Sequence, residues 1–222
     1  MHPMTTDLFD LAHTYAASLL SQCTYPWEAL PKISGFLIDL GMNLPKGKYN
    51  EVEKHVWVAQ SAYVAPTAVL CAPCVIGERT EIRHCAYIRG SVLVGTDCVV
   101  GNSTELKNAV LFDGVQVPHF NYIGDSILGY LSHFGAGAIT SNVKSDKTPV
   151  VVHDRTTGEN IATALQKLGA LIGDGVEIGC NCVLNPGTVI GRNTSVYPLT
   201  SVRGVVPPDS IVKDTITVIS KH

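Results

Sequence analysis

The chain has 222 residues, enough for one long domain or for one domain with an appendage. Charged residues make up only 16% of the sequence and the formal net charge is −3, so the basic footprint of a nucleic-acid-binding protein is absent. No apolar run of about eighteen residues is present, and the first ten residues carry Asp7 and Asp10 but no Lys or Arg. These features argue against a membrane span and a secretory signal, and predict a cytoplasmic protein.

Residues 1–50 are predicted to form an N-terminal helical segment and a linker. Apolar residues at helical spacing predict a helix over residues 5–22, with Thr5 or Thr6 as its cap. A second short helix is expected within residues 27–40. Residues 41–49 contain Pro45 and two glycines and are interpreted as a linker.

From residue 51 onward an aliphatic side chain recurs at every sixth position, and a small residue usually stands two positions before it. The first run comprises Val52, Val58, Val64, Leu70, Ile76, Ile82, Ile88, Val94, Val100, Leu106 and Phe112, and the second comprises Ile172, Ile178, Leu184, Ile190, Val196 and Val202. A period of six fits neither an α-helix nor a simple strand and is the hexapeptide repeat of a parallel β-helix, in which three repeats close one triangular coil. Residues 51–222 are therefore predicted to form an all-β solenoid.

Three of the seven cysteines, Cys74, Cys98 and Cys182, fall at the small-residue position of the repeat. They are interpreted as reduced, buried residues. The spacing of Cys71 and Cys74 leaves a zinc site or a disulfide as the alternative.

Two stretches depart from the repeat. Between residues 116 and 140 the period is irregular, and Pro118 occupies an expected aliphatic position. Residues 143–166 leave the repeat altogether and are expected to form an excursion loop with a turn at residues 156–158. Long loops on a rigid scaffold often carry function. A weak alternation over residues 214–219 predicts a final strand.

Apolar residues expected on the outer faces predict a symmetric oligomer, in particular a homotrimer. They are Tyr87, Val92, Val110 and Leu111.

A series of polar residues interrupts the repeat in a recognisable order. It consists of Arg89, the segment Gly101-Asn-Ser-Thr-Glu-Leu-Lys107, the segment His119-Phe-Asn-Tyr122-Ile-Gly-Asp125 and the segment His133-Phe-Gly-Ala136-Gly-Ala-Ile-Thr-Ser-Asn142. Over about residues 64–215 the chain resembles the acetyltransferase domain of the bifunctional bacterial enzyme that makes UDP-N-acetylglucosamine. This resemblance implies a left-handed β-helix and an acyl-CoA-dependent transferase acting on an amino-sugar phosphate or nucleotide sugar.

The resemblance also implies roles for individual residues. His119 matches the general base that takes a proton from the sugar amine, a task suited to an imidazole that is neutral near pH 7. Arg89 and Lys107, eighteen positions apart, would stack in successive coils and hold a phosphate together with Tyr122. His133, Asn142 and Lys147 match positions that contact the acceptor.

For acetyl-CoA, the co-substrate, the matching positions are Ala136, Cys180 and Pro198. Gly135 and Gly137 would let the thioester approach the backbone, where an N–H could hold the oxyanion. No metal ligand is expected in this reading.

The chain departs from the family pattern at three points. His133 replaces an asparagine, Val143 replaces a tyrosine after Asn142, and the excursion loop is inserted where the family closes its site. The family's nucleotidyltransferase domain opens with a glycine-rich phosphate loop, but the first glycine here is Gly35. Uridylyl transfer is therefore not expected of this chain.

Two other functions stay open. The first is a zinc hydratase of the carbonic anhydrase type, which shares the β-helix and would use His84, His119 and His133 at a subunit interface. The second is a non-catalytic binding or scaffold subunit, which the departures at His133 and Val143 favour.

Overall fold

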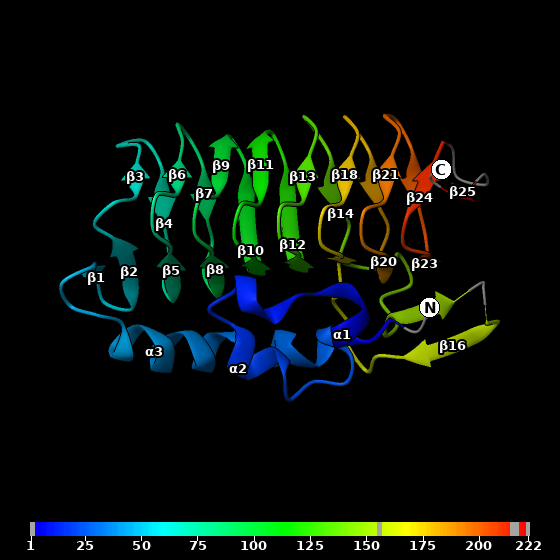
Figure 1. Ribbon diagram of the computed structural model, residues 1–222, viewed down its shortest axis with the longest axis horizontal. Helices are drawn as coiled ribbons and strands as arrows, with labels where there is room; N and C mark the ends of the chain where they lie inside the picture. Colours follow the sequence, from blue (N-terminus) through cyan, green and yellow to red (C-terminus); the bar gives the residue numbers. More distant parts are fainter. Residues whose placement is uncertain (1–2, 155–156, 214–217, 221–222) are drawn as a thin grey trace.

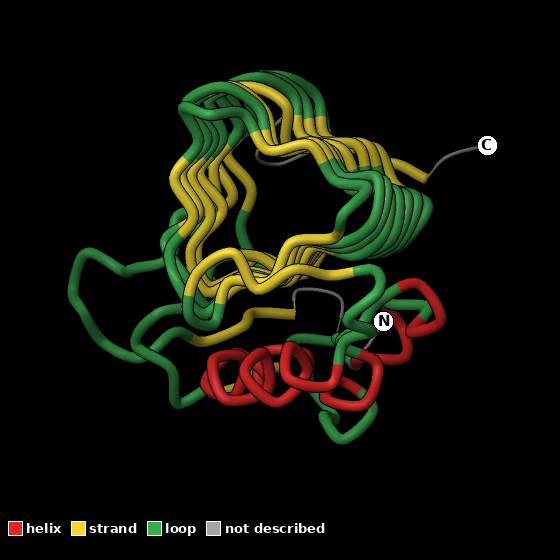
Figure 2. The backbone as a smooth tube through the Cα atoms, turned by 90° about the vertical axis from the view of Figure 1, so that its left-hand side faces the viewer, coloured by secondary structure: helices red, strands yellow, loops and turns green. Residues whose placement is uncertain are grey.

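The computed structural model describes residues 3–154, 157–213 and 218–220. Its main body is a left-handed parallel β-helix with a triangular cross-section, and a helical N-terminal segment lies along one side (Figures 1 and 2). Short strands stack into three faces, and each strand pairs in parallel with its counterparts in the coils before and after it. No helix in these residue ranges is long and apolar enough to cross a lipid bilayer.

Each face is one column of stacked strands. Face 1 contains β3 (Tyr63–Val64), β6 (Glu81–Ile82), β9 (Val99–Asn102), β11 (Gln116–His119), β13 (His133–Phe134), β18 (Glu177–Ile178), β21 (Ser195–Val196) and β24 (Ser210–Val212), with β25 (Val218–Ser220) added antiparallel at its end. Face 2 contains β4 (Val69–Leu70), β7 (Tyr87–Ile88), the first parts of β10 (Glu105–Leu111) and β12 (Tyr122–Leu128), β14 (Ile139–Thr140), β19 (Val183–Leu184) and β22 (Ser201–Val202). Face 3 contains β2 (Val56–Ala59), β5 (Cys74–Ile76), β8 (Val92–Val94), the last parts of β10 and β12, β17 (Ala170–Ile172), β20 (Thr188–Ile190) and β23 (Val205–Val206).

The repeat positions fill the interior as the sequence predicts. From Ile76 to Leu106 every aliphatic residue of the repeat is fully buried. Cys74, Cys98 and Cys182 are buried beside them, and all seven cysteines are free. Burial raises the pKa of the Cys98 thiol to about 12, so this side chain stays protonated as a small core residue. The interpretation of these three cysteines as reduced core residues is confirmed.

The expectation that the first run keeps one phase is wrong at both ends. Val52 is 55% exposed because it belongs to β1 (Tyr49–Glu53), which forms an antiparallel hairpin with β2 before the coils begin. Ile88 pairs with Leu106, 18 positions later, but Val94 pairs with Leu111, only 17 positions later. One residue is therefore missing from the corner at Lys107-Asn108. This slip places Val117, rather than Pro118, beside Val100.

The N-terminal helices pack on face 3. They are α1 (Thr5–Leu8), η1 (Leu11–His13), α2 (Ala17–Leu20), η2 (Pro26–Lys32) and α3 (Ile33–Asn43), and α3 and η2 contact the strands of this face (Figure 2). The single helix expected over residues 5–22 is wrong: extended residues at Phe9 and Thr14 divide it into three short pieces, and no side chain caps α1. The second expected helix is present, but α3 continues into the expected linker as far as Asn43.

The homotrimer was predicted from a strip of apolar residues expected to be exposed, and this expectation is wrong for most of them. Val92, Val110 and Leu111 are all at least 99% buried. Val110 points out of the β-helix but lies under the helices, whereas Val92 and Leu111 alternate with it and face the interior. Only Tyr87 of this set is exposed.

The excursion of residues 143–166 contains a β-hairpin of β15 (Val151–Asp154) and β16 (Glu159–Ala162). Residue 156 of its predicted turn lies outside the described residues, and so do residues 214–217 of the predicted final strand. Val150 and Val152 are buried, so the base of the hairpin packs onto the β-helix rather than extending into solvent.

Phe134 and Phe120 provide a matched test of this architecture. Phe134 is fully buried in the interior, whereas Phe120 stands 62% exposed on a corner. We expect Phe134→Ala to lower the free energy of unfolding by about 3–5 kcal/mol, because it leaves a cavity in a tightly packed coil. Phe120→Ala should leave it nearly unchanged. Urea unfolding followed by circular dichroism measures both, and equal midpoints for the two variants would contradict the assigned register.

Candidate active site

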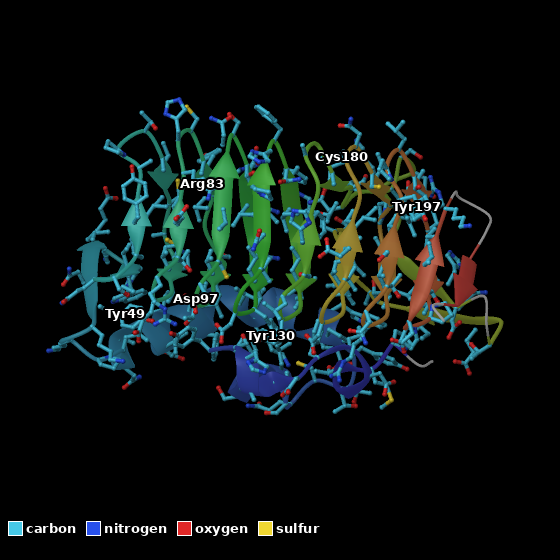
Figure 3. All side chains as sticks on the ribbon, turned by 45° about the horizontal axis from the view of Figure 1, so that its top comes forward. Tyr49, Arg83, Asp97, Tyr130, Cys180 and Tyr197 are labelled. Atoms are coloured by element: carbon cyan, nitrogen blue, oxygen red, sulfur yellow. The ribbon has the colours of Figure 1, made fainter. Side chains whose placement is uncertain are left out.

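Three corners separate the faces, and two of them carry the predicted site residues. Edge 1/2 joins faces 1 and 2, and edge 2/3 joins faces 2 and 3. The N-terminal segment lies along the remaining corner, edge 3/1, and over face 3. Edge 1/2 is thus on the side of the molecule away from the helices. Cys180 and Tyr197 mark this edge in Figure 3, whereas Asp97 and Tyr130 lie toward the helices.

His119, Ala136, Cys180 and Pro198 form one row along edge 1/2. The Gly137 N–H donates to the His119 carbonyl (3.0 Å), the Asn181 N–H to that of Ala136 (2.8 Å) and the Leu199 N–H to that of Cys180 (2.9 Å). Each bond links one corner to the next coil, so these positions are stacked about 4.8 Å apart, the usual spacing of paired strands. His119, Cys180 and Pro198 are exposed and Ala136 is half-buried.

Asn121 fixes the backbone at the start of this row. Its side chain is 2% exposed and its Oδ1 accepts from the His119 N–H (3.1 Å), while its Nδ2 donates to the carbonyls of Gly135 (2.9 Å) and Ala138 (3.1 Å). One amide therefore joins the corner of His119 to the corner of Ala136. Sequence reasoning missed this residue although a signal was present, because Asn121 is a polar residue at the small-residue position of the repeat.

The Ala136 N–H forms no hydrogen bond with any of the residues in the ranges described above. The neighbouring Gly137 N–H is occupied by His119. A free backbone N–H on this row, one coil beyond an exposed imidazole, can hold a developing oxyanion.

The second group of predicted residues lies along edge 2/3. Ile88 pairs with Leu106, so Arg89 and Lys107 are adjacent in successive coils, as their spacing predicts. Both are already paired with carboxylates: Arg89 Nη1 lies 2.6 Å from Glu105 Oε1, and Lys107 Nζ lies 3.3 Å from Asp125 Oδ2. Glu105 keeps the guanidinium of Arg89 charged and raises its pKa further above the usual value.

Asp125 is the centre of this second cluster. It is only 4% exposed, and besides Lys107 it accepts from Asn108 Nδ2 (2.9 Å) and Asn142 Nδ2 (2.5 Å). Asn142 also donates to the hydroxyl of Tyr122 (3.2 Å), and burial raises the pKa of that hydroxyl. Asn108 and Asp125 both have positive φ, a conformation that asparagine and aspartate tolerate.

The remaining predicted residues lie apart from both groups. His133 projects from face 1, where its Nδ1 is 2.8 Å from Glu177 Oε2. Lys147 is exposed in the excursion. His84 is in the row of His119 but two coils away, roughly 10 Å at strand spacing, and it contacts Thr67 (2.7 Å). Within the described part of one chain, no three His, Cys, Asp or Glu side chains come close enough to hold a metal ion.

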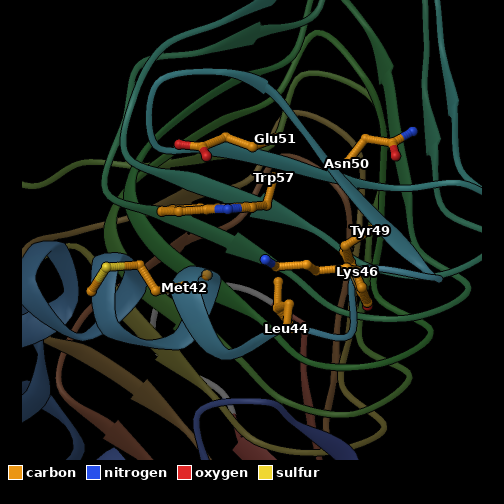
Figure 4. A pocket seen from close by; sticks show the side chains of 8 residues that line it. Met42, Leu44, Lys46, Tyr49, Asn50, Glu51 and Trp57 are labelled. Carbon is orange, nitrogen blue, oxygen red and sulfur yellow. The ribbon is translucent and has the colours of Figure 1, made fainter.

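Figure 4 shows a cavity of about 610 Å³ at the start of the β-helix, between the end of α3 and the hairpin of β1 and β2. Met42, Leu44, Lys46 and Trp57 line it. None of the predicted site residues contributes to this cavity.

Comparison with known proteins agrees with the β-helical fold. Residues 70–165 match the family model of the GMPPB C-terminal domain, and residues 169–204 match that of the bacterial transferase hexapeptide (six repeats). Both matches lie within the β-helix and agree with its hexapeptide repeat.

Two curated proteins are similar in sequence to this chain. The bifunctional protein GlmU of Methanococcus maripaludis is 30% identical over 72% of this chain and 33% of its own length. The bifunctional sugar-1-phosphate nucleotidylyltransferase/acetyltransferase of Sulfurisphaera tokodaii is 37% identical over 40% of this chain and 22% of its own length. The chain resembles the acetyltransferase part of these proteins and spans at most about a third of their length.

Among solved structures, a point mutant of AntD, an N-acyltransferase from Bacillus cereus, is 15% identical. The superposition covers 76% of this chain and 81% of the AntD chain, with a TM-score of 0.41. A similarity this low supports no argument about function. Its structure is a complex with dTDP-4-amino-4,6-dideoxyglucose and coenzyme A.

The ion pairs on edge 2/3 predict that Lys107 and Arg89 differ in their effect on stability. Lys107→Met removes the cation of the nearly buried Asp125, which keeps its two amide donors, and we expect a loss of about 2 kcal/mol in the free energy of unfolding. Arg89→Met breaks a solvent-exposed pair and should not change stability measurably. Thermal unfolding of the two variants provides the measurement, and an equal loss in both would show that the Asp125 cluster is not structural.

Proposed function

We propose that this chain transfers an acyl group, acetyl in the simplest case, from acyl-CoA to an amino-sugar phosphate or nucleotide sugar. The single observation that carries the proposal is the row of His119, Ala136, Cys180 and Pro198 on the uncovered edge. A thioester with a long pantetheine arm fits such a row, because the arm can lie parallel to the axis while the acyl end meets the histidine.

The chemistry follows from His119 and the backbone beside it. The amine of the acceptor attacks the thioester carbonyl while the imidazole of His119 takes its proton. A C–N bond forms and the C–S bond breaks, so CoA leaves as a thiolate and takes up the proton. The free N–H of Ala136 stabilises the oxyanion between these events. The protein itself forms no covalent intermediate.

The acceptor is proposed to contact edge 2/3 through Arg89, Lys107, Tyr122 and Asn142, with Lys147 and His133 as further contacts. His119 and Gly124 are five residues apart in one coil and so at most roughly 18 Å apart, and Gly124 pairs with Lys107. A nucleotide sugar is long enough to reach both edges of one chain. A shorter sugar phosphate is proposed to lie between edges of neighbouring copies.

A site shared between copies supports a homotrimer. Its contacts would be made by other residues than the apolar strip predicted from the sequence. The helices cover face 3, which leaves faces 1 and 2 and edge 1/2 for contact with other copies. Exposed apolar side chains gather there; they are Tyr63, Val69, Tyr87, Phe120, Tyr197 and Leu199.

One observation favours the non-catalytic alternative. Arg89 and Lys107 are both neutralised by carboxylates of the same chain, and Lys107 belongs to a cluster that stabilises a corner. In a scaffold subunit these pairs would be permanent, whereas in an enzyme a substrate phosphate would have to displace Glu105 from Arg89.

His119→Ala tests the catalytic proposal. We expect kcat with acetyl-CoA and glucosamine 1-phosphate to fall 10²–10⁴-fold, since that is the usual contribution of a general base, while acetyl-CoA still binds. CoA thiol release measures the rate. His84→Ala is the matched control, because it removes an exposed histidine of the same row and should leave the rate unchanged. Full turnover by His119→Ala would exclude the proposed base.

Thiol labelling tests the proposed position of CoA. Cys180 and Cys85 are both exposed and both lie on edge 1/2, but only Cys180 is in the proposed CoA path. We expect saturating acetyl-CoA to slow maleimide labelling of Cys180 at least about tenfold, since a bound ligand covers it, and to leave Cys85 unaffected. Mass spectrometry of the labelled peptides gives both rates in one sample. Equal protection of the two, or of neither, would place CoA elsewhere.

A further inference from the structure

The strongest unassigned feature is a cavity of about 320 Å³ between the excursion hairpin and edge 2/3. Lys144, His153 and Arg203 line it, together with the polar residues Ser141, Ser145 and Asn185. No carboxylate is among its lining residues, although the chain as a whole has a net charge of −3. Lys144 Nζ is already paired with Asp146 Oδ2 (3.3 Å), so the attraction of the cavity for an anion depends mainly on Arg203.

Arg203 belongs to the row that begins with Arg89 and Lys107. Ser141 donates its N–H to Leu184 (2.8 Å) and Asn185 donates to Val202 (3.0 Å), so the row continues through Ser141 and Asn185 to Arg203. Arg89 and Lys107 are held by Glu105 and Asp125, but Arg203 forms no ion pair or side-chain hydrogen bond with any residue in the described ranges. It is exposed at the rim of the cavity with its donors available.

The hairpin is seated firmly enough to form a fixed wall. A Cβ at Gly204 would lie 2.6 Å from the carbonyl oxygen of His153, so only glycine permits this approach of β15 to the corner. Thr163 Oγ1 donates to the Val150 carbonyl (2.6 Å), and the Leu168 N–H donates to that of Asn142 (3.0 Å). These contacts hold His153 over the same corner that carries Arg203.

Asn185 adds a neutral group to the floor of the cavity. It is 8% exposed, and its Nδ2 donates to Ser201 Oγ and to the Val202 carbonyl, both at 2.9 Å. With both donors directed into the coil, its Oδ1 is the atom left to accept from a hydroxyl or an amine. An arginine beside such an acceptor suits a phosphorylated sugar or nucleotide better than an inorganic ion alone.

We propose that this cavity is a phosphate or pyrophosphate subsite of the transferase, with Arg203 as its main anion-binding residue and Lys144 and His153 beside it. The proposal rests on the proposed function for the identity of the substrate, but not for the existence of the anion site. It also accounts for the excursion, which supplies Lys144 from the loop before the hairpin and His153 from β15. Its phosphate comes either from the acyl acceptor or from CoA.

Arg203→Gln in the full chain tests the subsite, with Arg79→Gln as the matched control. Arg79 is an exposed arginine on edge 3/1, paired with Asp97 (2.7 Å) and remote from the cavity. We expect inorganic pyrophosphate to bind the wild type and Arg79→Gln alike and Arg203→Gln about tenfold or more weakly, because a charge-assisted contact is lost. Calorimetric titration measures this without any turnover. Absence of binding to the wild type, or equal binding by Arg203→Gln, would overturn the proposal.

Kinetic measurements then identify the source of the phosphate. A higher KM for glucosamine 1-phosphate in Arg203→Gln, with kcat and acetyl-CoA affinity unchanged, assigns the subsite to the acceptor. Weaker binding of acetyl-CoA but not of acetyl-pantetheine, which lacks the phosphates, assigns it to CoA. If the wild type shows no turnover but Arg203→Gln still binds pyrophosphate more weakly than the wild type, the anion site is supported and the proposed transferase function is contradicted.

Discussion

The narrow interior of the coil is the constraint on which the rest of this structure depends. Each coil encloses little more than one aliphatic side chain per face, and the burial of each such side chain contributes roughly 1.5–3 kcal/mol. Because consecutive coils stack at strand spacing, every residue is held beside its counterpart one coil away. A side chain placed at a corner is therefore repeated as a row along the axis. The residues of the proposed sites are arranged in such rows: His119 with Ala136, Cys180 and Pro198 on one edge, and Arg89 with Lys107 and Arg203 on another.

The polar cluster around Asp125 forms where the corners of edge 2/3 are shortened. The corner at Lys107-Asn108 is one residue shorter than the one before it, and β10 and β12 run through the corner as continuous strands. The backbone then turns at Asn108 and Asp125 with positive φ, and the side chains of these two residues meet at 2.9 Å. A nearly buried carboxylate in such a corner needs several donors, and Lys107, Asn108 and Asn142 supply them. Lys107 thus has a structural reason to be there whether or not a substrate phosphate also reaches it.

The period of six was sufficient to predict the β-helix, the stacking of Arg89 on Lys107 and the burial of the three cysteines, because all of these follow from position modulo the repeat. The period could not predict which carboxylate pairs with each cation. No role was expected for Glu105 or Asp125, and their ion pairs with Arg89 and Lys107 depend on the side-chain geometry of a shortened corner. The one-residue slip was missed because Leu111 and Phe112 are both apolar, so either can be taken as the repeat position. The three short helices were missed because extended residues at Phe9 and Thr14 interrupt a segment whose apolar residues recur at helical spacing.

The cover of face 3 did leave a signal in the sequence. On faces 1 and 2 the residue before the repeat aliphatic is often polar, as in Glu81, Glu105 and Glu177, whereas on face 3 it is apolar, as in Leu93, Val110 and Leu171. A strand that is apolar on both sides must be covered on both sides. The N-terminal segment provides that cover and is fixed across several coils. Tyr15 contacts Thr96 (3.0 Å), His13 stacks on Tyr130 (3.7 Å between ring centroids), and the Asp10 N–H donates to Asp174 Oδ2 (2.7 Å). By occupying face 3 and edge 3/1, this segment leaves edge 1/2 open. The exposed row that begins at His119 is therefore a consequence of where the helices pack as much as of the repeat itself.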